Sequence, residues 1–191
     1  MLALLPSLLH CTLTGANREP IEADTAQRRH ALRSRAWVAA LADAFRVHYR
    51  GDPDVRVGSK HDPSNRREFG LNELLYDVLV CRVGTAPAAN NPSPLTYVRE
   101  ALWQVESEFA RDSRQAVYDL NKLVLGAAPH KLLVGPQVSD EARFLAALLP
   151  AARCCSGEVY VALVPHPAQW DACEAKVRVW QFVQGEWTGV A

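Results

Sequence analysis

The chain has 191 residues, of which 49% are apolar and 22% charged, and its 21 basic side chains equal its 21 acidic ones. Its length predicts one domain of roughly 100–200 residues, and its composition excludes a disordered polypeptide. The neutral net charge excludes a strongly basic nucleic-acid-binding protein. We therefore expect residues 1–191 to form a single α/β domain.

The first 20 residues are rich in leucine but lack the basic start and the small-residue cleavage site of a signal peptide. We expect residues 1–20 to form an apolar segment that packs on the domain. No stretch reaches the roughly 18 apolar residues of a membrane span, so no membrane contact is expected. The five cysteines have no metal-binding spacing, which predicts a reduced, cytoplasmic protein.

The first half of the chain is predicted to contain one long helix and two strands. Apolar residues at three- and four-residue spacing predict a helix over 22–48. Residues 51–70 hold Pro, Gly, Ser and Asn without periodicity, which predicts a long, partly mobile surface loop. Strands are predicted over 71–83 and 99–109, and the Ala, Asn and Pro of 85–95 predict a turn-rich connection between them.

The second half alternates between helices and strands. Two helices are predicted, the first from Asp112 or Ser113 to about Leu125 and the second over 140–149, where Pro150 closes it. Strands are predicted over 131–134, 158–164 and 176–183, with a last short segment after Gly185. This order of elements predicts α/β layers around a mixed sheet with extra strands at the C-terminus.

Carboxylates interrupt the first two predicted strands. Asp77 lies in the middle of an apolar run, where a carboxylate without partners costs several kcal/mol. In the second strand, the period of two places Gln104, Glu106 and Glu108 on one face. Like charges on one face repel, and a divalent cation such as Mg²⁺, which prefers oxygen ligands, would resolve the repulsion.

Two alternatives stay open at this point. The second strand can lie at a sheet edge with a wet face, in which case Glu106 and Glu108 only keep the protein soluble. On the following predicted helix, Lys122 shares a face with Asp119. Lys122 can therefore reach back toward the carboxylates, or it can simply pair with Asp119.

These residues resemble the PD-(D/E)xK, or restriction-endonuclease-like, superfamily. The family has a helix, a strand hairpin that carries Asp and then (Asp/Glu)-x-Lys, a second helix and a further strand. Asp77 looks like the family Asp and Glu106 like its second acid, and the resemblance covers roughly residues 30–135. The chain departs from the pattern at Tyr76, which replaces the motif proline, and at Glu108, which replaces the motif lysine.

The resemblance implies a restriction-endonuclease-like core that performs Mg²⁺-dependent phosphodiester hydrolysis, or an inactive relative of such an enzyme. It implies that Asp77 and Glu106 hold the metal, that Glu108 is a further ligand or orients water, and that Lys122 replaces the motif lysine from the next helix. Nucleic acid is the implied partner, and four basic side chains of the predicted loop are candidate phosphate contacts: Arg56, Lys60, Arg66 and Arg67. The alternative function is a non-catalytic protein-interaction module on the same fold, which the neutral charge favours.

Overall fold

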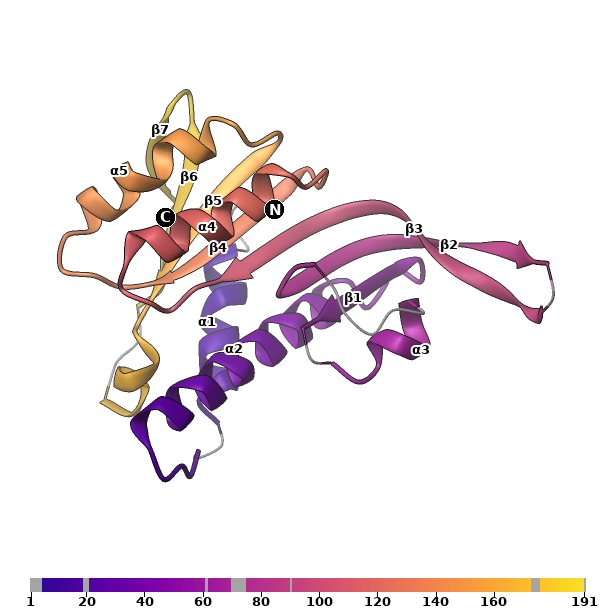
Figure 1. Ribbon diagram of the computed structural model, residues 1–191, viewed down its shortest axis with the longest axis horizontal. Helices are drawn as coiled ribbons and strands as arrows, with labels where there is room; N and C mark the ends of the chain where they lie inside the picture. The colour runs from indigo at the N-terminus through magenta and orange to yellow at the C-terminus, as the bar shows by residue number, and fades with distance from the viewer. Residues whose placement is uncertain are drawn as a thin grey trace.

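A mixed β-sheet forms the centre of the protein in the computed structural model, which describes residues 5–18, 21–60, 62–69, 75–89, 91–172 and 176–190 (Figure 1). Within these residues the sheet has seven strands in chain order. They are β1 (Val55–Ser59), β2 (Val78–Ala88), β3 (Asn91–Ser107), β4 (His130–Pro136), β5 (Glu158–Val164), β6 (Arg178–Val183) and β7 (Glu186–Val190). Strands β3, β4 and β5 are parallel, and all other neighbours are antiparallel. The predicted α/β architecture with a mixed sheet is confirmed.

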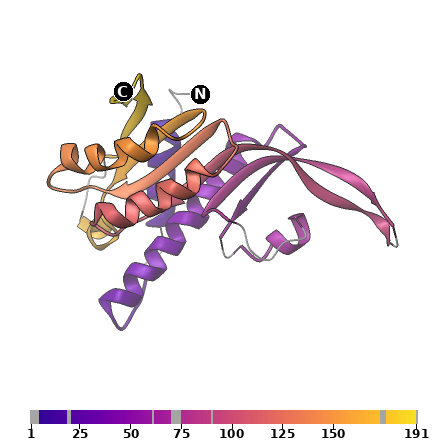
Figure 2. The same cartoon turned by 45° about the horizontal axis from the view of Figure 1, so that its top comes forward.

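Helices cover both faces of the sheet (Figures 1 and 2). On one face, α1 (Leu5–Ala16) and α2 (Ala26–His48) bury Leu9, Trp37 and Phe45 against the strands. On the other face, α4 (Ser113–Val124) and α5 (Glu141–Ala152) form a second core around Leu120 and Leu148. The described residues also form the short α3 (Asn65–Phe69) and the 3₁₀ helix η2 (Pro167–Ala172).

The alternation of β3 divides its side chains between these two cores, as its period of two predicts. Trp103 and Val105 belong to the core beneath α2. Glu106 contacts Lys122 of α4, and Gln104 accepts a hydrogen bond from the N–H of Ala128 just beyond that helix. The acidic face of β3 therefore looks toward α4.

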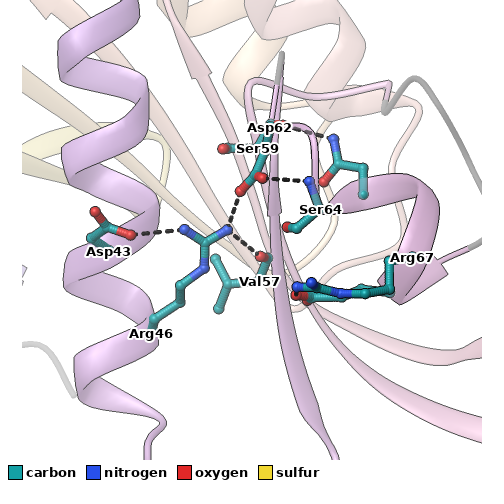
Figure 3. A network of polar contacts seen from close by, with 9 residues as sticks. Asp43, Arg46, Val57, Ser59, Asp62, Ser64 and Arg67 are labelled. Atoms are coloured by element: carbon teal, nitrogen blue, oxygen red, sulfur yellow. Dashed lines mark hydrogen bonds and ion pairs between the residues drawn. The ribbon is translucent and has the colours of Figure 1, made fainter.

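The prediction of a loop over 51–70 is wrong in the part of this segment that the structure describes. Residues 55–59 form β1, which pairs with β2, and α3 follows. Figure 3 shows how Arg46 of α2 holds this segment, because its guanidinium donates to the carbonyl of Val57 at 3.0 Å and to the carboxylate of Asp62. Asp62 also accepts the N–H of Ser64 at 2.8 Å. Long-range hydrogen bonds, which a local pattern does not reveal, fix this segment.

The prediction of a turn-rich connection over 85–95 is also wrong. Strands β2 and β3 continue to Ala88 and Asn91, so their outer halves form a two-stranded arm that projects from the body (Figures 1 and 2). Gly84 pairs with Tyr97, and a Cβ at Gly84 would lie 2.8 Å from the Tyr97 ring, so any larger residue would have to displace this exposed ring. The prolines that favoured a turn lack an N–H, which a two-stranded arm with open edges tolerates.

The other predicted elements are shifted rather than absent. Helix α2 begins at Ala26, and the strand predicted over 71–83 begins only at Val78, with residues 71–74 outside the described ones. Helix α5 continues through Pro150 to Ala152. Helix α1 packs through Leu5, Leu9 and Leu13, as expected for the apolar N-terminal segment. None of the described helices combines the length and the apolar character that a membrane crossing requires.

Candidate active site

Asp77 and Glu106 lie side by side at one end of the β2–β3 pair. Val78 pairs with Val105, and the same antiparallel register continued by one residue places Asp77 opposite Glu106. Both residues are buried, with exposed fractions of 7% for Asp77 and 2% for Glu106. The backbone N–H of Ser107 donates to Oδ2 of Asp77 at 2.9 Å, which fixes the orientation of that carboxylate. The structure thus brings the two acids together on one face.

Lys122 of α4 completes this pair from the neighbouring helix. Its Nζ lies 3.2 Å from Oε2 of Glu106 and 2.6 Å from Oδ1 of Asp119. Helix α4 buries Ala116 and Leu120 in the core, which turns the neighbouring face with Asp119 and Lys122 toward the end of β3. Both alternatives for Lys122 therefore hold at once, because it reaches the strand carboxylate and pairs with Asp119.

The surroundings of Glu106 disfavour the ionised form of its carboxyl group. Burial raises its pKa, the charge of Asp77 raises it further, and the Lys122 ammonium only partly opposes them, so the pKa is about 8. Burial alone would lower the pKa of Lys122, but the carboxylates of Asp119 and Glu106 raise it above its ordinary value. The second oxygen of Glu106, Oε1, is buried and has no hydrogen-bond partner among the described residues. A buried acceptor without a partner costs free energy, which a bound cation would recover.

A pocket of about 380 Å³ opens over these groups. Asp77, Glu106, Glu108 and Lys122 line it from the strand ends and from α4. The opposite wall comes from the first half of α2, through His30, Ala31, Ser34, Arg35 and Val38, whose three- and four-residue spacing puts them on one helix face. The acidic pair is thus buried at its base and open to a ligand from one side.

Glu108 and Lys60 lie at the edges of the same pocket. Glu108 lines it, but one carboxylate oxygen accepts the N–H of Ala110 at 2.6 Å. Lys60 follows β1, where its N–H donates to the Asp77 carbonyl at 2.8 Å and its Nζ lies 3.5 Å from Oδ1 of Asp77. This role of Lys60 was not predicted because it depends on β1, for which the alternating Val-Arg-Val was the only signal of a strand.

Two of the basic side chains predicted to contact phosphates instead bind groups of nearby residues in the chain. Arg56 donates to the carbonyls of Pro53 and Val55, and Arg67 pairs with Glu68. Of the four predicted residues, Lys60 is the one that lines the pocket.

Mg²⁺ fits the donor set at the base of the pocket. This ion is bound in proteins by one or two carboxylates and completes its octahedron with waters and substrate phosphates. Asp77 and Glu106 supply two adjacent carboxylates, one of them with an unpartnered oxygen. Among the described residues no group of three or more His, Cys, Asp or Glu side chains is placed to hold a metal ion. Water and substrate would therefore provide most of the ligands.

No family model matches the sequence, and a search of curated proteins found no related one. Any function must therefore be inferred from the site itself. A pocket that joins paired carboxylates, an ammonium group and further cations can bind a divalent cation together with an anionic substrate.

Proposed function

We propose that the protein is a metal-dependent nuclease of the PD-(D/E)xK type that hydrolyses phosphodiesters. The observation that carries this proposal is the buried Asp77–Glu106 pair, with Lys122 at 3.2 Å from Glu106, at the base of a pocket. The order of α2, the antiparallel strands β1 to β3, α4 and the parallel β4 supports it, because that order is also the one the superfamily uses.

Four side chains of the pocket have distinct parts in this proposal. Asp77 and Glu106 would hold Mg²⁺, which supplies positive charge at the phosphorus and a more acidic bound water. Lys122 keeps its ammonium beside Glu106 and stabilises negative charge that develops on the phosphate oxygens. Glu108 lies on the rim, where its carboxylate orients the attacking water by accepting a hydrogen bond.

The decisive experiment is thermal unfolding during a titration with Mn²⁺ or Mg²⁺, combined with a cleavage assay on labelled DNA and RNA. A cation that binds only the folded protein stabilises it by about 2.7 kcal/mol at 100 times its Kd. Asp77→Asn removes the charge but leaves an oxygen to accept the Ser107 N–H, so it should abolish the stabilisation while the fold remains. The matched control is Asp24→Asn, because Asp24 is exposed and, among the described residues, forms its ion pair with Arg28 alone. If the unmodified protein shows no shift of its unfolding temperature with either cation and cleaves neither DNA nor RNA, the nuclease proposal is rejected.

A second candidate function is a protein-interaction module, and the β2–β3 arm favours it. Residues 84–98 contain no charged side chain, and Leu95, Tyr97 and Val98 are exposed there. An isolated two-stranded hairpin is marginally stable in water, so a partner would stabilise the arm. NMR chemical-shift changes that are confined to arm residues on partner binding would support this function in place of hydrolysis, provided that metal ions have no effect on unfolding.

A cytoplasmic location is part of the same proposal. The four cysteines among the described residues, Cys11, Cys81, Cys154 and Cys155, are free thiols, which agrees with a reducing compartment.

A further inference from the structure

A group of histidine and arginine side chains lies at and beside the pocket, where the parallel strands end. His30 of α2 stacks against His166, which follows β5, with ring centroids 5.1 Å apart and an angle of 30° between the rings. Nδ1 of His166 accepts the N–H of Ala168 at 3.1 Å. The other ring nitrogen, Nε2, therefore carries the proton and is the one that can donate to a ligand.

Two arginines extend this group. Arg35 lines the pocket, and Arg111 closely follows Glu108 and Phe109, which also line it. Burial lowers the pKa of His166, and the charges of Arg111 and His30 lower it further, so at neutral pH this ring is an uncharged hydrogen-bond donor. Arg35 and Arg111 are both exposed, and across the described residues the structure records no ion pair between either of them and a carboxylate. An arginine without an acidic partner and a neutral imidazole N–H can both donate hydrogen bonds to a phosphate.

The group is continuous with the acidic pocket. His30 and Arg35 line the pocket that contains Asp77 and Glu106, and His30 also contacts His166 beyond it. Its members come from α2, from the segment after β3 and from the segment after β5. A ligand that starts at the acidic pair and leaves over this wall of α2 would therefore meet positive charge.

We propose that His30, Arg35, Arg111 and His166 form a second phosphate subsite, which binds the backbone of a nucleic-acid strand whose neighbouring phosphate lies at Asp77 and Glu106. This proposal rests on the proposed nuclease function and names its substrate as a strand of at least two phosphates. It also accounts for a neutral chain that binds a polyanion, because the required charge is local rather than spread over the surface.

The test is fluorescence-anisotropy binding of a labelled 12-nucleotide single strand, in EDTA so that no cleavage occurs, at several salt concentrations. The double variant Arg35→Gln/Arg111→Gln should bind at least tenfold more weakly than the unmodified protein. Its slope of log affinity against log salt should fall by about 1.4, because each lost phosphate contact on a single strand removes about 0.7. The matched control is Arg143→Gln/Arg153→Gln, which removes the same charge from exposed positions in the first turn of α5 and at its C-cap.

The outcomes separate this subsite from the nuclease itself. Equal loss of affinity in both double variants, or no binding by the unmodified protein, overturns the subsite. If the metal-linked stabilisation and cleavage persist in that case, the nuclease stands without it. If instead the Arg35/Arg111 variant alone loses binding while no metal effect is found, the subsite stands as a strand-binding site and the hydrolytic function fails.

Discussion

Nζ of Lys122 on α4 lies 3.2 Å from Oε2 of Glu106 at the end of β3, sixteen residues earlier in the chain. In the motif that the sequence resembles, the lysine would stand at position 108, which is Glu in this chain. The helix thus supplies an ammonium that the strand lacks. Asp119 pairs with the same ammonium from one turn away and keeps it in place.

Replacing Lys122 should separate catalysis from metal binding. Lys122→Met keeps much of the aliphatic stem but removes the charge, so we expect cleavage to fall by about 10²–10³-fold, as for the loss of one electrostatic stabiliser. The stabilisation by Mn²⁺ should persist, because Asp77 and Glu106 remain. Lys176→Met at an exposed position is the control and should leave both measurements unchanged. Loss of the Mn²⁺ effect in Lys122→Met would show that Lys122 organises the metal ligands instead.

The raised pKa of Glu106 predicts how stability depends on pH. The carboxyl is protonated in the folded protein up to about pH 8, whereas the unfolded chain releases this proton above about pH 4.5. The folded state then binds more protons, so the contribution of Glu106 to stability falls as pH rises through this window and levels off above pH 8. Glu106→Gln removes the effect and should stabilise the protein by about 2–4 kcal/mol more at pH 9 than at pH 4.5.

Urea unfolding of Glu106→Gln at pH 4.5 and pH 9 in EDTA measures this difference. The control is Glu186→Gln, which makes the same change at an exposed glutamate of β7. A gain that is the same at both pH values would mean that Glu106 is ionised in the folded protein throughout.

The acidic pair and Lys122 could be predicted from the sequence, whereas the rest of the pocket could not. Asp77 and Glu106 stand out because a carboxylate in an apolar strand is costly, and the register follows once the two strands pair. Lys60 reaches the site through β1, a five-residue strand with two buried valines, which is too short for a clear period. His30 and Arg35 lie in the polar first half of α2, and only the tertiary position of this helix brings them to the pocket.

The errors in the predicted fold also come from contacts between residues that are distant in the sequence. Arg46 ties α3 and β1 to α2 through contacts that span up to 16 residues of sequence, and no local periodicity reports them. The prolines of the β2–β3 arm correctly signal that a backbone donor is missing, but a strand with an open edge has no need of that donor. Helix α4, with its Asp112 cap and its regular apolar spacing, was predicted nearly to the residue because its signals are local.

Gly126 should tolerate no side chain, because Gln104 occupies the space. A Cβ at Gly126 would collide with Oε1 of Gln104, which is buried and accepts the N–H of Ala128 at 3.2 Å. Gly126→Ala must displace this amide and leave a buried N–H unpaired, so we expect a loss of about 1–3 kcal/mol in urea unfolding. Gly51→Ala is the control, since a Cβ there meets nothing within 4 Å, and should change stability by less than about 0.5 kcal/mol.

The link from Asp62 to Arg46 should stabilise the segment that carries Lys60. Burial would raise the pKa of Asp62, but the N–H of Ser64 and the guanidinium of Arg46 lower it below its ordinary value. The ionised form is thus favoured in the folded protein, and its contribution is complete above about pH 4 and lost as pH falls through the lowered pKa. Asp62→Asn should cost about 1–2 kcal/mol at pH 7, measured by urea unfolding, and much less near pH 2.

Asp43→Asn provides a matched control for this pair, because Asp43 contacts the same guanidinium but its side chain is 69% exposed. An exposed ion pair contributes little, so this variant should lose less than about 0.5 kcal/mol at pH 7. Because Lys60 directly precedes the Asp62 segment and lies 3.5 Å from Asp77, Asp62→Asn should also weaken binding of the 12-nucleotide strand, whereas Asp43→Asn should not. Equal stability losses in the two variants would mean that Asp62 does not anchor the segment. In that case β1 pairing alone would place Lys60 beside the acidic pair.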